Sequence, residues 1–388
     1  MKLAKKILVG VVAVLALAVA ALAVTLSYDA DCEATRPLPA GTPGMKAIVY
    51  GCYGPPGVLR LTDVERPVPT ADQLLVQVHT AAVNPLDWHY LRGEPYIMRL
   101  TSGIGRPAVN RLGVDFAGTV VAVGRDVTRF RPGDAVFGGV TGAFAEFVVI
   151  RESRAVASKP ANVGFEEAAA VPIAAITALQ AVRDKGGVRA GHKVLINGAS
   201  GGVGTFAVQI ARDLGAEVTG VCSTRNVELV RSLGADHVVD YTQEDFTRGD
   251  RRFDVIIDMV GSHSLLAYRR VLAPDGVVVI VGSTSRDPWL GPLLRPLAGL
   301  LVDPFVSQRF VTLLAELNQP DIETLAGLLG SGKLKPAIDR RYGLEQLPEA
   351  IEYLETGRAR GKVVIDVSPP PAVAPESPPA ALEATPAA

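Results

Sequence analysis

A short glycine-rich stretch is the part of this sequence whose residue types and spacing best suit chemistry. Apolar residues 193–197 run into it, and a helical pattern follows over residues 205–214. Glycines permit a tight turn and a close backbone approach, and the start of the following helix offers N–H groups to an anion. The first glycine of the usual G-x-G-x-x-G spacing is replaced by alanine. The stretch predicts a turn that holds the pyrophosphate of a dinucleotide, made by Ala199, Ser200, Gly201, Gly202, Val203 and Gly204.

The residues after the next predicted strand, 217–221, indicate which dinucleotide binds. An NAD enzyme places a carboxylate there, about 20 residues beyond the turn, to accept a hydrogen bond from the ribose 2′-hydroxyl. This chain instead has Ser223, Thr224, Arg225 and Asn226. Hydroxyl and guanidinium groups suit a 2′-phosphate, so we expect NADP, used as NADPH, rather than NAD.

Alternating short apolar strands and helices surround the glycine-rich stretch. We expect strands at 193–197, 217–221, 237–240, 255–258 and 276–281 with helices between them, after a single alanine-rich helix over 166–183. This alternation is typical of a parallel sheet with right-handed crossovers. Residues 45–159 show short strands separated by Gly and Pro turns, which favours a separate β domain. A final strand is expected at 361–367.

The overall composition excludes several classes of protein. The chain has 388 residues, 48% hydrophobic and 20% charged, with a formal net charge of -1. It is therefore not disordered as a whole, and no basic stripe suggests a nucleic-acid partner. Three cysteines cannot supply a disulfide framework or a four-cysteine zinc site, and the five histidines are scattered singly.

The N-terminus carries an apolar run without charge from Ile7 to Leu26. Such a run is long enough to cross the ~30 Å hydrocarbon core of a bilayer as a helix. Lysines precede it and acidic residues follow it, so the positive-inside rule would leave the lysines in the cytoplasm and the body outside. The alternative is a cleaved signal peptide ending at Ala21-Leu22-Ala23, which would make the protein secreted. We expect an uncleaved single-pass anchor at the membrane.

These patterns divide the chain into six segments. We expect an anchor or signal over 1–26, a Pro/Gly linker over 27–44, the β domain over 45–165, the nucleotide domain over 166–305, a return to the β domain over 306–367, and a disordered Pro/Ala tail over 368–388. Leucines at helical spacing in 287–305 are expected to pack in the core, to cover the cleft, to join subunits or to contact lipid.

Several stretches together resemble the medium-chain dehydrogenase/reductase superfamily, and most of all its zinc-independent quinone oxidoreductases and enone reductases. In the order of that family they are Val83-Asn84-Pro85-Leu86-Asp87, Gly113–Gly118, Arg131–Asp134, Gly198–Gly204, Leu233–Tyr241 and Gly361–Val364. The resemblance covers residues 45–367. It implies an α/β fold in which a GroES-like β domain, split in sequence, joins a doubly wound Rossmann domain, here preceded by the N-terminal hydrophobic helix.

The resemblance also places residues around the cofactor and predicts the assembly. It implies that Tyr241 lies near the adenosine phosphate, and that Gly282 and Ser283 lie near the nicotinamide. The nicotinamide would lie in the cleft between the two domains. Members of the superfamily are commonly dimers or tetramers, and we expect a homodimer.

The zinc alcohol dehydrogenases of this superfamily supply a comparison for the metal site. Where they carry zinc ligands, this sequence has Asn84, Val114 and, on a looser match, Ile173. Valine and isoleucine offer no donor that zinc accepts. The four-cysteine lobe is absent from the sequence too, and Leu86 replaces the proton-relay hydroxyl. We therefore expect no metal.

Without a metal, the chemistry left is hydride transfer to an acceptor that already delocalises charge, such as a quinone or an α,β-unsaturated carbonyl. Asn84 is the candidate donor to the acceptor's oxygen. Asp87 is expected to organise its loop or to relay a proton, and His89 and Tyr90 are the titratable candidates. Each of the four also has a purely structural interpretation.

Two further functions compete with an NADPH-dependent quinone or enone reductase. One is a membrane-tethered NADPH-binding module without turnover, and the other is a reductase of aldehydes and other carbonyls. Because NADPH is cytosolic while the lysines place the body outside, the side of the membrane stays open. The sequence also leaves the physiological substrate open.

Overall fold

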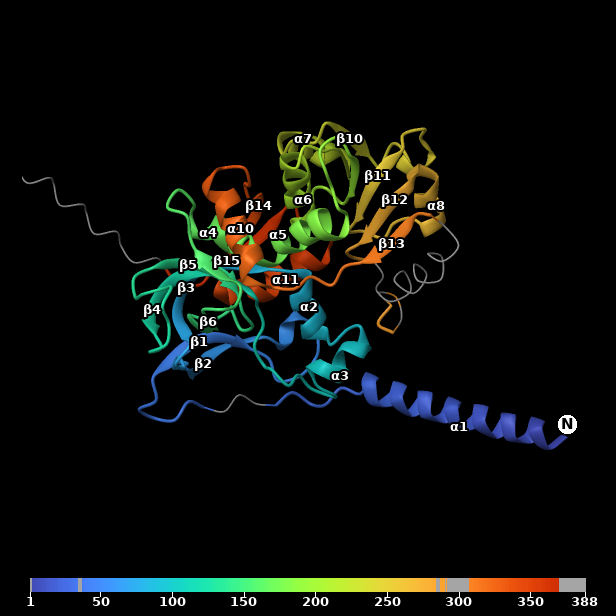
Figure 1. Ribbon diagram of the computed structural model, residues 1–388. Helices are drawn as coiled ribbons and strands as arrows, with labels where there is room; N and C mark the ends of the chain where they lie inside the picture. Colours follow the sequence, from blue (N-terminus) through green and yellow to red (C-terminus); the bar gives the residue numbers. More distant parts are fainter. Residues whose placement is uncertain (1, 34–36, 284–286, 290, 292–306, 370–388) are drawn as a thin grey trace, which may run out of the picture.

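The computed structural model describes residues 2–33, 37–283, 287–289, 291 and 307–369. Two lobes, each built on a β-sheet, form the body, and helix α1 (Lys2–Ser27) extends away from it as a single rod (Figure 1). In the described part of the chain, α1 is the one helix long and apolar enough to cross a membrane. Its described side chains are almost all exposed, as expected for a helix without a protein partner.

The β domain is built on a sheet in the order β14-β15-β3-β4-β5-β7, with β6 paired to β3. Short turns separate most of its strands, and β1 and β2 form a separate antiparallel pair. β15 runs antiparallel beside β3, which brings the end of the chain back to the domain in which it began. The strands are β1 (Gly44–Val49), β2 (Arg60–Glu65), β3 (Gln73–Val83), β4 (Asp115–Val123), β5 (Ala135–Gly139), β6 (Phe147–Arg151), β7 (Val156–Ser158), β14 (Ile338–Gly343) and β15 (Lys362–Asp366).

The second lobe carries a parallel sheet in the order β10-β9-β8-β11-β12-β13. The chain moves outward in one direction from β8 to β10 and in the other from β11 to β13, so the order reverses beside β8. Ligands of such sheets bind at this reversal, beyond the carboxyl ends of the strands. The strands are β8 (Lys193–Asn197), β9 (Glu217–Cys222), β10 (His237–Asp240), β11 (Phe253–Asp258), β12 (Leu272–Ile280) and β13 (Arg309–Thr312).

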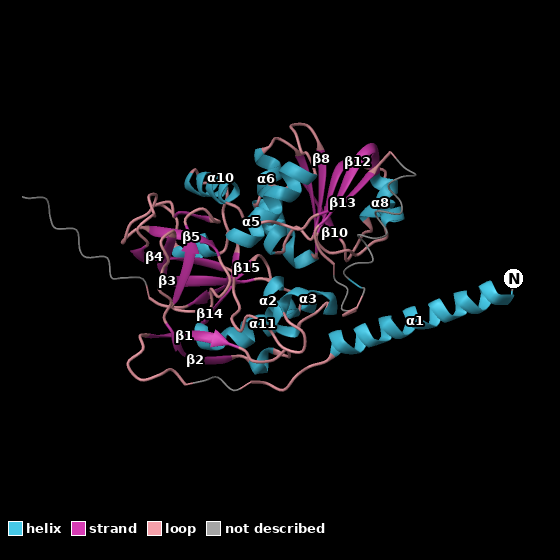
Figure 2. Ribbon diagram, turned by 60° about the horizontal axis from the view of Figure 1, so that its bottom comes forward, coloured by secondary structure: helices cyan, strands magenta, loops and turns pink. Residues whose placement is uncertain are grey.

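Helices cover both sheets and fill the space between them (Figure 2). The single helix expected over 166–183 is wrong: it is divided near Pro172, because proline is accommodated only in the first turn of a helix. The helices of the body are α2 (Pro85–Arg92), α3 (Arg99–Ser102), α4 (Phe165–Ala169), α5 (Pro172–Leu179), α6 (Gly202–Asp213), α7 (Val227–Ser232), α8 (Leu265–Val271), α10 (Gln319–Gly330) and α11 (Leu347–Glu355). The short helices are η1 (Pro56–Val58), η2 (Tyr96–Met98), the π-helical η3 (Gln180–Lys185), η4 (Thr224–Asn226), η5 (Phe246–Arg248) and η7 (Leu344–Gln346).

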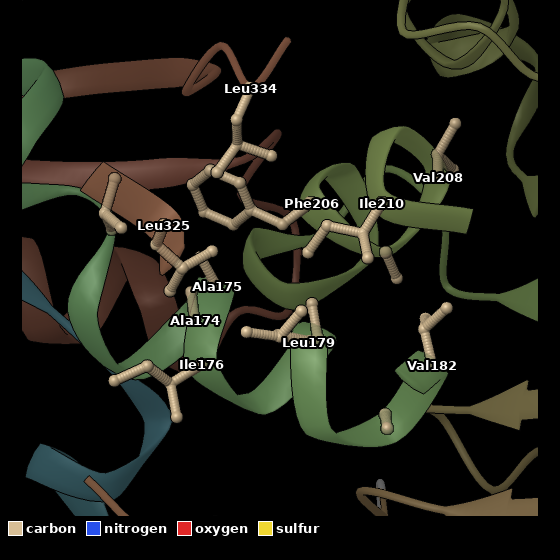
Figure 3. Close-up of a cluster of buried hydrophobic side chains, with 14 of the residues drawn as sticks. Ala174, Ala175, Ile176, Leu179, Val182, Phe206, Val208, Ile210, Leu325 and Leu334 are labelled. Carbon is tan, nitrogen blue, oxygen red and sulfur yellow. The ribbon is translucent and has the colours of Figure 1, made fainter. Parts of the chain in front are cut away.

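One hydrophobic cluster joins the two lobes. It unites Phe137 of the β domain with Phe206 of α6 and Leu325 of α10, all fully buried. Figure 3 shows α5, with Ala174 and Leu179, packed against α6, while Leu325 approaches from α10. Burying each large side chain contributes about 1.5–3 kcal/mol. The lobes are therefore held in a fixed relation, and this fixes the cofactor turn relative to the β domain.

The segment after α1 is attached to the body. Leu26 is buried, the backbone of Asp29 forms a parallel β-bridge with that of Gly105, and Cys32 is joined to Cys52 by a disulfide. A linker was expected over 27–44, and the sequence does not predict the disulfide. Three cysteines give no pattern, and the contact exists only because the chain folds back.

Candidate cofactor and active site

The glycine-rich turn lies between β8 and α6 and uses its glycines for specific steric reasons. Gly198 has φ of +91°, a left-handed conformation that favours glycine. A Cβ on Gly204 would lie 2.1 Å from the Gly198 carbonyl oxygen, so only glycine fits there. Gly201 precedes the twelve-residue helix α6, whose first N–H groups have no partner within the helix. With the partial positive charge of the helix end, this turn fits the pyrophosphate of a dinucleotide.

Side chains tie the turn to the end of β9. Asn226 donates from Nδ2 to Ser200 Oγ at 3.0 Å and to Ser223 Oγ at 3.3 Å. Its Oδ1 is buried without a hydrogen-bond partner. Among the described side chains, this atom and His192 Nδ1 are the two buried polar atoms that have no hydrogen-bond partner. A buried acceptor without a donor beside the turn fits a site that a ligand with hydroxyl groups completes.

The predicted adenosine end is exposed. Arg225 donates to the Arg358 carbonyl at 2.7 Å, and the Tyr241 side chain is 61% exposed. The expectation of a site without a carboxylate is incomplete, because Asp240 from the neighbouring strand β10 accepts from Thr224 Oγ1 at 2.5 Å. Hydrogen bonds, that from Thr224 foremost, lower the pKa of Asp240. The carboxylate therefore stands charged beside the predicted 2′-phosphate position.

Gly282 and Ser283 follow β12 at the carboxyl edge of the sheet. Gly282 N–H donates to the Asp258 carbonyl at 3.3 Å, and a Cβ on Gly282 would lie 2.5 Å from the Met259 carbonyl oxygen. Asp258 is fully buried and accepts from Asn197 at 2.9 Å. These bonds join the ends of β8, β11 and β12, so both predicted nicotinamide residues lie at the carboxyl edge of the sheet, one strand from the reversal between β8 and β11.

A buried polar cluster lies at the end of β3, where the β domain faces the turn. Lys362 Nζ donates to Asn84 Oδ1 at 2.5 Å and to Asp115 Oδ2 at 3.1 Å, while Asn84 Nδ2 donates to Asp115 Oδ2 at 2.9 Å. The three residues are at most 3% exposed. A buried ammonium and carboxylate are compatible with folding because each has the other and an amide as partners.

The cluster and the turn are joined by backbone contacts. Gly361 N–H donates to the Ser200 carbonyl at 2.9 Å, and Gly201 and Gly361 form a parallel bridge. A Cβ on Gly202 would lie 3.3 Å from Lys362 Cδ. The last strand of the β domain thus brings a lysine from one lobe against the glycine turn of the other. Sequence reasoning assigned no site role to Lys362 or Asp115, although both lie in stretches that resemble the family.

The other three catalytic candidates lie on α2. Asp87 accepts from the N–H of Asn84 at 2.8 Å and of Gly113 at 3.1 Å, and burial raises its pKa to about 7. His89 Nδ1 lies 2.7 Å from the Glu94 carbonyl oxygen, and burial lowers the pKa of its ring. Tyr90 is 37% exposed. Asp87 therefore closes the first turn of α2, His89 is fixed and neutral, and Tyr90 remains accessible.

Three residues of this chain stand where the zinc alcohol dehydrogenases carry their metal ligands. Asn84 is engaged by Lys362 and Asp115, Val114 is partly buried, and Ile173 donates its N–H to Asp115 Oδ1 at 2.9 Å. The described ranges contain no group of three or more His, Cys, Asp or Glu able to hold a metal. Zinc requires thiolate, imidazole or carboxylate donors, and the carboxylate here is paired with an ammonium. The residues present do not fit a zinc ion.

Comparison with known proteins gives the family. Residues 70–161 match the alcohol dehydrogenase GroES-like domain, and residues 233–365 match the zinc-binding dehydrogenase family. The chain is 35% identical over 340 residues to 2-methylene-furan-3-one reductase of Solanum lycopersicum, covering 84% of this chain and 80% of that protein. The chain belongs to the medium-chain dehydrogenase/reductase superfamily, in its quinone oxidoreductase-like branch.

Two further relatives agree with this placement. The chloroplast envelope quinone oxidoreductase homolog of Arabidopsis thaliana is 31% identical, over 83% of this chain and 98% of that protein. The solved quinone oxidoreductase of Coxiella burnetii superposes with a TM-score of 0.74 at 32% identity, covering 84% of this chain and all of that one. The predicted fold, a GroES-like domain with a Rossmann domain, is confirmed. The protein is an NAD(P)H-dependent oxidoreductase of the quinone oxidoreductase-like class.

Proposed function

We propose that this protein transfers a hydride from NADPH to a quinone or an α,β-unsaturated carbonyl without the help of a metal. The observation that carries the proposal is the buried cluster of Asn84, Asp115 and Lys362. Asn84 stands at one position where the resemblance places a zinc ligand, and Asp115 follows the second, Val114, and accepts from the N–H of the third, Ile173. The cluster also adjoins the glycine-rich turn through Gly361 and Ser200. A fixed ammonium and amide replace the Lewis acid there.

The chemistry is balanced by one hydride and one proton. NADPH, when bound, supplies the hydride, so that a quinone and a proton become a hydroquinone while NADP⁺ is formed. The acceptor delocalises the developing negative charge, and the protein needs only to position it and stabilise its oxygen modestly. Gly201, Gly202 and the start of α6 would hold the pyrophosphate, and the ammonium of Lys362 favours charge that develops beside it.

Roles for the α2 residues follow from their contacts. His89 has its Nδ1 engaged by a carbonyl, and Tyr90 is partly exposed. We assign proton delivery to the Tyr90 hydroxyl, which exchanges with solvent, and a positioning role to Asp87. Asn84 acts by holding Lys362 and Asp115 in place, because both of its polar side-chain atoms already have partners.

The preference for NADPH rests on opposing charges. Arg225 and the hydroxyls of Ser223 and Thr224 suit a 2′-phosphate. Asp240 opposes it, but that carboxylate is held by Thr224, Thr242 and Gln243. We assign the preference to NADPH because the guanidinium can leave the Arg358 carbonyl at little cost on an exposed surface.

A specific observation favours a second candidate, a membrane-tethered NADPH-binding module. The lysines before α1 and the Cys32–Cys52 disulfide both suit a body on the non-cytoplasmic side, because disulfides persist in oxidising compartments. Cytosolic NADPH does not reach that side. A protein exported with its nucleotide bound would then sense or store it rather than turn it over.

One experiment separates the two functions. The full chain in lipid nanodiscs is supplied with NADPH and a panel of quinones, enones and saturated aldehydes, and absorbance at 340 nm is followed while calorimetry measures NADPH binding. The proposed reductase oxidises NADPH with quinones or enones. Tight binding without turnover across the panel identifies the module, and reduction of saturated aldehydes alone identifies a carbonyl reductase.

The homodimer remains a prediction, tested by the mass of the detergent-solubilised protein.

A further inference from the structure

The last turn of α1 is fastened to the body by a buried arginine. Arg99 is 1% exposed, and its Nη1 donates to the carbonyls of Leu26 at 2.9 Å and Tyr28 at 3.1 Å. The same nitrogen pairs with Asp29 at 2.9 Å, and Nε donates to the Gly93 carbonyl at 2.9 Å. Cations stabilise helix C-termini by satisfying their last carbonyls. Arg99 thus caps α1 with the same side chain that holds the end of α2.

Further links follow immediately along the chain. Ala30 N–H donates to the Gly105 carbonyl at 2.9 Å, and Glu33 pairs with Arg106 at 3.0 Å. The disulfide then fixes Cys32 to Cys52. A flexible tether would let the body turn freely below a membrane. These bonds instead give α1 and the region around α3 one common orientation.

Exposed apolar side chains gather around this attachment. Tyr96 packs edge-on against Trp289, with ring centroids 4.7 Å apart, and its N–H donates to the Pro288 carbonyl at 2.8 Å. Tyr28 lies 3.1 Å from the position a Cβ would take on Gly105. We call the following six residues the apolar rim, each 39–59% exposed: Tyr28, Ile97, Leu100, Ile104, Val109 and Trp289.

We propose that the apolar rim is a membrane-docking face that lies in the interfacial region of the bilayer crossed by α1. The commitment to lipid, rather than to a second copy of the chain, comes from continuity: Figure 1 shows that α1 leaves the body beside α3, so the rim adjoins the point where the chain enters the membrane. Tyrosine and tryptophan are enriched at membrane interfaces. The inference rests on the membrane anchor and not on the proposed reductase chemistry.

The docking face has a consequence for the substrate. Helix α2 begins after Asn84 in the buried cluster and ends at Gly93, which Arg99 contacts. An eight-residue helix is about 12 Å long, so the candidate site lies one short helix from the face. An acceptor dissolved in the bilayer would approach the site from this side. The substrate class this favours is a lipophilic quinone or enone.

The two tryptophans of the chain make the proposal testable in the full-length protein. Trp289 belongs to the rim, whereas Trp88 is partly buried and stacks on His89 at 3.6 Å between ring centroids. The variants Trp88→Phe and Trp289→Phe are reconstituted in phosphatidylcholine vesicles with and without lipid brominated at carbons 6 and 7. We expect bromine to reduce the emission of Trp88→Phe about twofold, since an interfacial indole meets the acyl chains, and to leave that of Trp289→Phe nearly unchanged.

Equal quenching in the two variants, or none in Trp88→Phe, would overturn the proposal; the latter is also the result expected if a second copy covers the rim. A third variant adds Leu100→Glu and Ile104→Glu to Trp88→Phe and should lose the quenching, because charge is expelled from the acyl region. Unchanged NADPH binding shows that this variant is folded. NADPH turnover is measured separately, so an inactive protein that still quenches would contradict the reductase and leave the docking face standing.

Discussion

The two ends of the proposed cofactor site differ in how their charges are held. At the nicotinamide end, Lys362 and Asp115 are almost completely buried and pair with each other and with Asn84. At the adenosine end, Arg225 and Asp240 lie on the surface. Buried charges are tied to the fold because an unpaired one costs several kcal/mol, whereas surface charges interact weakly through water. We therefore expect substitutions at the buried charges to affect the stability of the fold, and substitutions at the surface charges to affect the choice of nucleotide.

Removing the buried ammonium should have the largest effect. The variant Lys362→Met leaves the Asp115 carboxylate buried without its cation, so we expect a loss of about 3–5 kcal/mol in the free energy of unfolding. Urea denaturation followed by circular dichroism measures it. The double variant Lys362→Met/Asp115→Asn should recover part of the loss. If the single variant is as stable as the original protein, the pairing of Lys362 with Asp115 does not stabilise the nicotinamide end.

The pH dependence of stability tests the same end through Asp87. Its pKa is raised from 3.8 to about 7 in the folded protein. The folded state therefore binds more protons than the unfolded state between these values, and stability falls as the pH rises from about 4 to about 7. The contribution is on the order of 2–4 kcal/mol. Urea denaturation gives the free energy of unfolding of the original protein and of Asp87→Asn at each pH across this range. The difference between the two free energies should fall as the pH rises, and a constant difference would contradict the prediction.

A methyl group in the glycine turn separates binding from folding. A Cβ on Gly201 would meet only the Gly198 carbonyl oxygen at 3.5 Å, an ordinary contact, so the variant Gly201→Ala should fold. It should nevertheless bind NADPH about a hundredfold more weakly, because the backbone no longer approaches the pyrophosphate. Calorimetry gives the affinity. Gly327→Ala, whose Cβ would meet nothing within 4 Å, is the matched control and should bind normally.

Substitutions at the exposed adenosine end should have the smallest effect, and it should be selective for one nucleotide. Without its guanidinium, Arg225→Ala should raise the KM for NADPH about tenfold and leave that for NADH unchanged, as one charge-assisted contact is lost. Steady-state kinetics with both nucleotides measure it. Asp240→Asn should shift the preference the other way, toward NADPH. If Arg225→Ala treats both nucleotides alike, the choice of nucleotide is made elsewhere.

Local patterns predicted most of the Rossmann domain. Strands β8 and β10 have the expected bounds, and β9, β11 and β12 differ by a few residues at their ends. Each contains a short apolar run bounded by glycine or polar residues, which is a local signal. β13 (Arg309–Thr312) was missed because the leucine- and proline-rich stretch before it carries no strand periodicity. β14 was missed because three adjacent charged residues, Asp339, Arg340 and Arg341, make it resemble a loop. The expectations for 292–305 fall outside the described residues.

The site was predictable only where it is local. The glycine turn could be found because one contiguous stretch carries its steric demands. The partners of Asn84 lie 31 and 278 residues away, and Asp240 reaches Thr224 only through the pairing of β10 with β9. Cys32 and Arg99 likewise acquire their roles when the chain folds back beside α1. Such contacts have no local signature in a single sequence.

The most direct test of metal-free hydride transfer measures turnover against metal content. The full chain in nanodiscs is dialysed against a chelator, its zinc is determined by mass spectrometry, and NADPH deuterated at carbon 4 is compared with ordinary NADPH in the presence of a quinone. We predict that turnover is unchanged by chelation at negligible zinc content, and that it shows a primary isotope effect with one deuterated epimer. Activity that falls with zinc and returns on its addition would contradict the account.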